Sequence, residues 1–188
     1  MDPMQALDVS SARVVDLVGQ VDRSQWELPT PCTEWNVRDL VGHLIGGMLG
    51  YIRLLHGAPA SELMELLQQH ATVGGDDVLA AAQDAATQLR AAFAEPGAQE
   101  RIVHHMIGDV PGSRLLLMRI MDNVVHGWDL ATALGLPAAI DDSLIELVHE
   151  YLAPRAAVLS DTGSFAPPPR TLDTGASPQE RLLTMVGR

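Results

Sequence analysis

The chain of 188 residues is poor in cysteine, in basic side chains and in long apolar runs, and each shortage excludes a class of protein. Its single cysteine, Cys32, excludes an internal disulfide and a cysteine-built zinc site, so any metal site must draw on carboxylates and the seven histidines. Twelve Lys and Arg against 24 Asp and Glu give a net charge of −12, which repels phosphate backbones and anionic lipids. We therefore expect neither nucleic acid nor a membrane as a partner.

The absence of export and membrane signals points to a single intracellular unit. The apolar runs are interrupted by His, Arg or Asp well before the roughly 20 residues that cross a bilayer. The opening MDPMQALDVSS lacks the basic-then-apolar layout of a secretory signal, so we expect a cytoplasmic protein. The length suits one globular domain, and the sequence contains no internal repeat. We therefore expect residues 1–188 to form a single domain.

Apolar residues at helical spacing dominate the chain and predict an all-α fold. The strongest helical stretches, with their capping or stop residues, are 3–22 after Asp2, 36–56 from Asn36, 76–95 before Pro96, and 113–135 up to Gly135. Two further helices are expected, one over 141–159 that is strained at Pro154 and a short one opened by the capping box SPQE at 177–180. This pattern favours a four-helix bundle with a long crossover connection and short extra helices.

The remaining segments are expected to be loops or short extended pieces. Prolines at 29 and 31 keep the stretch 26–35 out of a helix, and three prolines mark 165–170. Residues 100–108 are expected to be extended before the turn at 109–113, whereas 61–75 carries no clear signal.

Three side chains have the spacing and chemistry of a metal site. Asp122 and His126 are four residues apart on one predicted helix, so they project from the same face one turn apart. His43 lies on another, followed by Gly46, Gly47 and Gly50, which indicate either a cavity or a close helix contact. If the two helices are neighbours, the trio forms a two-histidine, one-carboxylate set suited to zinc, nickel or iron. The alternative is that both histidines are hydrogen-bonded core residues.

Other polar residues also have two interpretations. Asp129, three residues beyond His126, is either a partner that orients the imidazole or a solvated acid near a helix end. Cys32 is either a thiolate stabilised by helix amides or an inert buried thiol. The adjacent His104 and His105 should point to opposite sides of an extended segment, and the three other histidines should lie near helix ends or on exposed faces: His56, His70 and His149.

Two motifs carry a resemblance to a known family. TPCTEWNVRDLVGHLIGG and DNVVHGWDLATALG, in that order, resemble actinobacterial proteins related to the N-terminal domain of mycothiol-dependent maleylpyruvate isomerase, in the DinB-like superfamily. The ending ASPQERLLTMVGR is also similar to the tail of single-domain members. The resemblance implies a DinB-like four-helix bundle whose metal is held by His43, Asp122 and His126.

The resemblance also implies a chemistry, but this chain departs from the isomerase in two respects. Family members use a low-molecular-weight thiol, mycothiol, which a divalent metal activates as a nucleophile towards an electrophilic substrate. The isomerase has a glutamate where this chain has Asp122, and it carries a C-terminal domain for which 188 residues leave no room. The resemblance therefore supports the metal site more directly than it supports maleylpyruvate isomerisation. Zinc is the first choice of metal.

Three functions follow from these observations as hypotheses. The first is an enzyme of S-transfer or thiol-assisted isomerisation, for which the sequence assigns no general base. The second is a non-catalytic metal- or small-molecule-binding bundle, with a homodimer as one form. The third is a structural helical module in which His43 and His126 only pack.

Overall fold

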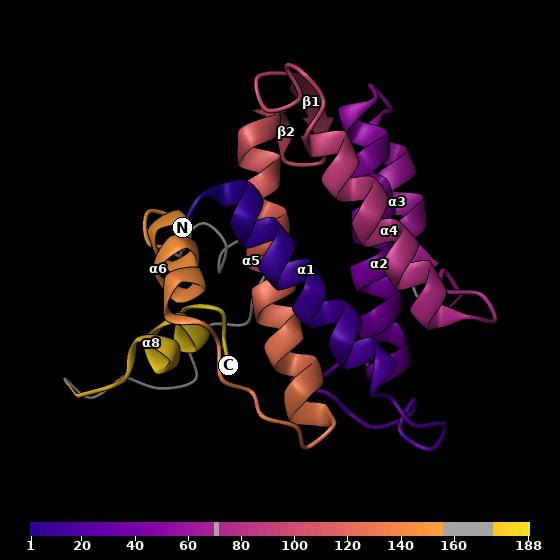
Figure 1. The fold of residues 1–188 in the computed structure, drawn as a ribbon, viewed down its shortest axis with the longest axis vertical. Coiled ribbons are helices and arrows are strands. Elements are labelled where there is room, and N and C mark those ends of the chain that lie inside the picture. The colour runs from indigo at the N-terminus through magenta and orange to yellow at the C-terminus, as the bar shows by residue number, and fades with distance from the viewer. Residues whose placement is uncertain (70–71, 156–174) are drawn as a thin grey trace.

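The computed structural model describes residues 1–69, 72–155 and 175–188, and this part of the chain is mostly helical (Figure 1). The helices are α1 (Pro3–Gly19), α2 (Val37–Leu55), α3 (Ala60–Gln68), α4 (Val78–Phe93), α5 (Gly112–Ala133), α6 (Asp142–Leu152) and α8 (Pro178–Met185). Strands β1 (Ile102–His105) and β2 (Gly108–Pro111) pair as an antiparallel hairpin in which Ile102 lies opposite Pro111. No helix in the described ranges is long and apolar enough to span a bilayer.

Helix starts follow the capping residues of the sequence. The Asp2 side chain accepts hydrogen bonds from two backbone amides of the first turn of α1. Asn36 and Asp39 form a reciprocal capping box at α2, and Ser177 and Glu180 form another at α8. Just after the C-terminal end of α5, Gly135 adopts a φ of 68°, a left-handed conformation that residues with a side chain rarely adopt. The helix therefore ends where expected.

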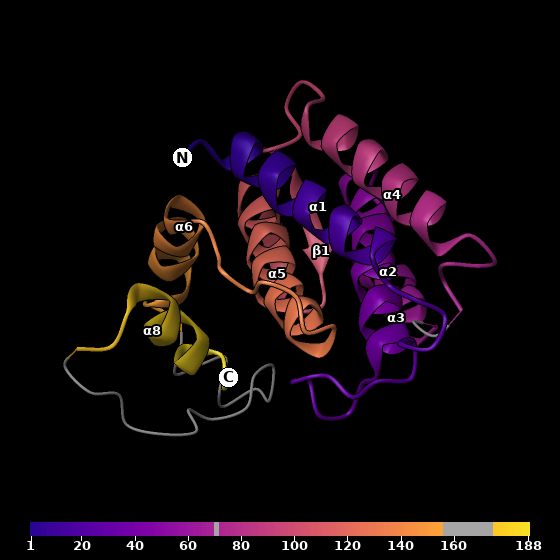
Figure 2. The same cartoon turned by 60° about the horizontal axis from the view of Figure 1, so that its bottom comes forward.

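The two helices that carry the candidate metal ligands lie against each other. Helix α5 contacts α1 and α2, and α4 contacts the same two helices from the other side, so that the four surround a common apolar core (Figures 1 and 2). Helix α3 covers α2, whereas α6 and α8 pack together beside α5. The direct contact of α2 with α5 meets the condition under which His43, Asp122 and His126 can converge.

Several predicted boundaries need correction. The first helix ends at Gly19 rather than 22, and the helix expected over 141–159 ends at Leu152, because the missing amide and the ring of Pro154 oppose its continuation. The chain is not all-α, because 102–111 forms a hairpin. Residues 102–105 are extended as expected, but the turn lies at 106–107, and 109–111, predicted as a turn, belong to the second strand. Residues 156–159, the proline-rich stretch 165–170 and His70 lie outside the described residues.

The glycines of α2 permit close helix contacts. A Cβ at Gly46 would lie 3.0 Å from the Leu66 carbonyl oxygen of α3, and one at Gly50 would overlap the Leu63 side chain. A Cβ at Gly47 would overlap the guanidinium of Arg119 on α5. Of the two explanations for these glycines, close contact with neighbouring helices is therefore the one that applies.

Substitution of a further glycine, Gly112, is expected to cause a large loss of stability. Its Cβ would overlap the backbone carbonyl oxygen of Ala98, which cannot move aside as a side chain can. We expect Gly112→Ala to lower the free energy of unfolding by about 2–3 kcal/mol in urea denaturation. Gly19→Ala is the matched control, because its Cβ would meet Leu79 at an ordinary 3.5 Å and alanine favours helix. Equal effects of the two substitutions would contradict this interpretation of Gly112.

Candidate metal centre

The structure brings together the three residues singled out from the sequence. His43 on α2 places its Nε2 atom 3.4 Å from Oδ2 of Asp122 on α5. The Nε2 atom of His126, one turn further along α5, lies 3.3 Å from Oδ1 of the same carboxylate. The two imidazole rings meet nearly edge to face, with their centroids 5.0 Å apart. The aspartate thus lies between two imidazole nitrogens contributed by two different helices.

The dimensions of this group suit a small divalent cation. One potential ligand atom from each residue lies within 4.8 Å of the others. Two ligands at about 2.0–2.1 Å from a tetrahedral zinc ion are about 3.3 Å apart, close to both His–Asp separations. The side chains of His43, Asp122 and His126 are only 17%, 20% and 8% exposed, so the group is shielded from bulk water yet not sealed. The donor set therefore fits a metal with open coordination positions.

A buried arginine already neutralises the carboxylate. Arg119, 1% exposed, donates a short charge-assisted hydrogen bond to Oδ2 of Asp122. Its guanidinium carbon also lies 5.7 Å from the centre of the Tyr51 ring, within cation–π range. Because Oδ2 is taken by this bond, Oδ1 is the oxygen of Asp122 with the freer approach.

The arginine is itself held by a buried polar network that leads to α1. Its Nε donates to Oδ1 of Asn123 at 3.1 Å, and the Asn123 amide nitrogen donates to the hydroxyls of Ser10 and Ser11 at 3.3 and 3.1 Å. All of these side chains are buried. The carboxylate position is therefore fixed by hydrogen bonds that reach across the bundle.

The far side of the His126 ring is oriented by a second carboxylate. Its Nδ1 atom lies 2.9 Å from Oδ2 of the fully buried Asp129. The Arg188 guanidinium donates to both oxygens of Asp129, at 2.6 and 2.8 Å. Of the two interpretations of Asp129, the orienting partner is the one that the geometry supports. An imidazole held in this way directs Nε2 towards Asp122.

The charges of the site shift its ionisation equilibria. Burial acts to raise the pKa of Asp122, but Arg119 and the two imidazoles outweigh it and hold that pKa well below its usual value. For His126, burial acts to lower the pKa, and the carboxylates of Asp122 and Asp129 reverse this and raise the pKa to about 9. Burial lowers the pKa of His43, against the opposing effect of Asp122. The two histidines are thus distinct in the metal-free protein, with His126 protonated and His43 neutral at pH 7.

Two residues of the loop between α1 and α2 border the site. The indole of Trp35 lies 4.5 Å from the His43 ring and 5.8 Å from the His126 ring, measured between centroids, and so covers both imidazoles. Cys32 forms a second potential ligand group with His126 and Asp129. Burial raises the pKa of its thiol, an effect that Arg188 only partly offsets, so the inert-thiol interpretation is favoured over a stabilised thiolate.

The other described histidines lie away from this centre. His56 is half exposed and pairs with Glu95, and His149 lies on an exposed surface. His104 and His105 point to opposite sides of β1, as expected, the first exposed and the second buried. Sequence reasoning missed Arg119 and Arg188. Of the two, only Arg119 could have been placed at the site from the sequence, because it lies one helical turn before Asp122.

Comparisons with known proteins identify relatives of this chain in sequence and in fold. The sequence profile of the mycothiol maleylpyruvate isomerase N-terminal domain family matches residues 7–131. Rv0738 and MT0763, two uncharacterized proteins of Mycobacterium tuberculosis strains H37Rv and CDC 1551, are 32% identical over 158 residues, which cover 84% of this chain and 80% of theirs. Crystal structures of mycothiol-dependent maleylpyruvate isomerase and of a mutant of it superpose with TM-scores of 0.69 and 0.70, covering 86% of this chain and 71% of theirs at 18% identity.

These findings establish the fold and the family of the protein. The fold is the mostly helical fold of those isomerase structures, with a small two-stranded sheet. The profile match over residues 7–131 shows that the chain belongs to the mycothiol maleylpyruvate isomerase N-terminal domain family. The family resemblance expected from the sequence is thereby confirmed.

Proposed function

We propose that this protein binds a divalent metal through His43, Asp122 and His126 and uses a low-molecular-weight thiol, mycothiol, in S-transfer or thiol-assisted isomerisation. The observation that carries the proposal is the convergence of two imidazole nitrogens on one carboxylate, each about 3.3–3.4 Å from it. Family membership supports the thiol, because the related solved enzyme is described as mycothiol-dependent. Zinc is the first choice of metal, with nickel and iron as alternatives.

The metal supplies one element of the chemistry and the chain supplies the rest. A divalent cation with an open position stabilises a bound thiolate near neutral pH and leaves its sulfur nucleophilic. His126 and His43 would hold the metal through Nε2, and the hydrogen bond between Nδ1 of His126 and Asp129 fixes the orientation of the His126 ring. Arg119 keeps Asp122 ionised, and Trp35 shields the two rings from water.

The architecture belongs to the same proposal. We assign residues 1–188 to one domain of the DinB-like four-helix bundle type, with α1, α2, α4 and α5 as its four helices. The mutual contacts of these helices support the assignment. The metal group then lies between two bundle helices, the usual location of such sites in this architecture.

Thiol-dependent turnover tests the catalytic part of the proposal. Zinc-loaded protein is mixed with mycothiol and monobromobimane, whose bromide is displaced by sulfur while the thiol proton passes to solvent. We expect fluorescent thioether to form faster than in the protein-free reaction, and His126→Ala to return the rate to that background. A wild-type rate equal to background, in protein shown to contain metal, would contradict an S-transfer activity.

One observation favours a second candidate, a non-catalytic binding protein. The ion pair of Arg119 with Asp122 holds the site together without a cation. The same residues can therefore persist as a structural or ligand-binding core, alone or in a homodimer. Metal binding without thiol-dependent turnover of any electrophile tested would select this candidate.

The orienting role of Asp129 gives a prediction. Asp129→Asn keeps the size of the side chain but removes the charge that holds the Nδ1 proton of His126. We expect zinc affinity to fall by about 10–100-fold in a competition titration with a chromophoric chelator. Asp109→Asn is the control, because that aspartate pairs with the exposed His104 on the hairpin and should leave the affinity unchanged. Equal zinc affinity in wild type and Asp129→Asn would contradict the role.

The pKa of His126 predicts how metal affinity depends on pH. A histidine must lose its proton to bind a metal, and the pKa of His126 is raised to about 9 in the metal-free protein. Affinity should therefore increase about tenfold per unit between pH 7 and 9 and then level off, because one proton is displaced in that window. Titration in metal-buffered solution measures this slope. A flat profile from pH 7 to 8.5 would show that His126 is already neutral.

A further inference from the structure

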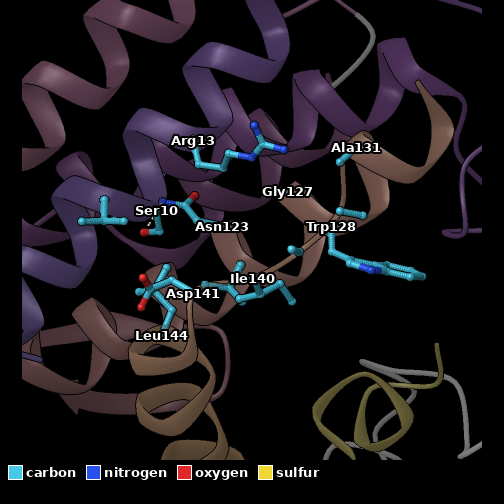
Figure 3. Close-up of a pocket in the computed structure, with 13 residues that line it drawn as sticks. Ser10, Arg13, Asn123, Gly127, Trp128, Ala131, Ile140, Asp141 and Leu144 are labelled. Atoms are coloured by element: carbon cyan, nitrogen blue, oxygen red, sulfur yellow. Dashed lines mark hydrogen bonds between the residues drawn. The ribbon is translucent and has the colours of Figure 1, made fainter. Parts of the chain in front are cut away.

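A cavity lies on the other side of α5 from Asp122 and His126. It is lined by α1, by α5 and by the segment that leads into α6, and it is partly open to solvent (Figure 3). Its volume is about 190 Å³, larger than an engineered apolar cavity of about 150 Å³ that takes up benzene. Most of its lining is aliphatic, including Val9, Val124, Ile140 and Leu144. The space and lining therefore suit one small, mainly apolar molecule.

Gly127 lies at the cavity wall, and crowding by neighbouring residues does not explain why this position is a glycine. Glycine in the middle of a helix is less stable than alanine, and Gly46, Gly47 and Gly50 each have a close neighbour that explains them. Among the described residues, the atom nearest to a Cβ at Gly127 is Cγ2 of Val14, at 3.9 Å. Alanine would fit there, yet the sequence keeps glycine at the cavity wall. This choice is accounted for if the space is reserved for a ligand.

The inner wall of the cavity offers one specific polar contact. Ser10 is 2% exposed, donates to the Leu7 carbonyl oxygen and accepts from Asn123. A hydroxyl oxygen has two lone pairs, so that of Ser10 can accept one more hydrogen bond. Asn123 donates both amide hydrogens, to Ser10 and Ser11, so neither Ser10 nor Asn123 has a hydrogen left to donate to a ligand. The wall therefore favours a ligand that donates a hydrogen bond, such as a hydroxyl.

The two charged groups at the cavity are hydrogen-bonded to the protein and opposite in sign. Arg13 donates to the Pro137 carbonyl oxygen at 2.6 Å and forms an ion pair with Asp16. Asp141 caps α6 and accepts from the backbone amide of Ser143. These two charges are opposite in sign and both are engaged. Because the two charges are opposite in sign, the cavity as a whole favours neither a cation nor an anion, and a neutral ligand avoids the cost of burying a charge.

We propose that this cavity is a binding site for a small neutral phenol or alicyclic alcohol, with its ring against the aliphatic wall and its hydroxyl donating to Ser10. The site is independent of the metal centre, from which α5 separates it. The two are nevertheless joined by one hydrogen-bonded path, because Asn123 contacts both Ser10 and Arg119.

Nuclear magnetic resonance of the full chain tests the proposal with p-cresol as the probe. We expect saturable shifts of the amides of Gly127, Ala131 and Ile140, with a Kd of about 0.1–1 mM. Benzoate and benzylammonium, which match the ring but carry charge, should bind at least tenfold more weakly. Shifts that do not saturate, or that map to another surface, would overturn the site. Tighter binding of either ion would overturn the ligand class.

Two variants test the same site, one by filling the cavity and the other by removing the hydroxyl. Gly127→Leu should fill the cavity and weaken p-cresol binding at least tenfold, whereas Thr132→Leu, at an exposed position on the same helix, should leave it unchanged. Ser10→Ala should weaken p-cresol severalfold but leave toluene binding as in wild type, because only the phenol uses the hydroxyl. Unchanged p-cresol affinity in both Gly127→Leu and Ser10→Ala would overturn the proposal.

Discussion

Replacing His126 by alanine is expected to lower zinc affinity by more than about 100-fold. Changes to groups that merely orient a metal ligand cost about 10–100-fold, and His126 is assigned as a ligand itself. The substitution should leave the fold intact, because Asp129 keeps both of its bonds to Arg188 when the imidazole is gone. Competition against a chelator of known affinity measures the loss, and circular dichroism checks the fold.

His56→Ala provides the matched control for this experiment. His56 also pairs with a carboxylate, that of Glu95, but its side chain is 50% exposed and belongs to neither group of potential metal ligands. Its removal should change zinc affinity less than twofold. Similar losses in the two variants would mean that zinc binds to surface histidines, and the assignment of His126 would then be wrong.

Replacing Arg119 by methionine is expected to produce the largest loss of stability in the metal-free protein. The guanidinium is almost completely buried and balances the charge of Asp122 while it also holds Asn123. Removing one partner of a buried ion pair costs about 3–5 kcal/mol. Asp122 would keep only the protonated His126 as a positive partner, and His126 is shared with Asp129. Urea denaturation in the presence of a chelator measures this loss.

Zinc should restore part of that stability, because a cation between the two imidazoles would replace the missing positive charge beside Asp122. The increase in melting temperature on adding zinc should therefore be larger for Arg119→Met than for wild type. Arg53→Met is the control, since its ion pair with Glu62 is exposed and should contribute no more than about 1 kcal/mol. Equal destabilisation of the two variants would contradict the role assigned to Arg119.

The pairing of Asp122 with His126 could be predicted because it depends on local periodicity. The two residues share a face through helix geometry alone, whereas the glycines after His43 indicated either a cavity or a close helix contact and did not identify the neighbouring helix. Capping residues at Asp2, Asn36 and Ser177 likewise located three helix starts, because a cap is a contact between near neighbours in sequence.

The contacts that could not be predicted are those between distant parts of the chain. Arg188 meets Asp129 across 59 positions, and Asn123 meets Ser10 across 113, so neither pair follows from spacing. The burial of Arg119 was equally hidden, because an arginine on an amphipathic helix is usually solvated. Its place in the core depends on the absence of a side chain at Gly47, a feature of a different helix.

The most direct test of the metal assignment is a crystal structure of zinc-loaded protein with data collected at the zinc absorption edge. We predict one anomalous peak about 2.0–2.1 Å from Nε2 of both His43 and His126 and within bonding distance of Asp122. A peak among Cys32, His126 and Asp129, the other group of potential ligands, would place the metal on the wrong side of the imidazole. Such a peak, or none at all in either group, would contradict the proposed centre.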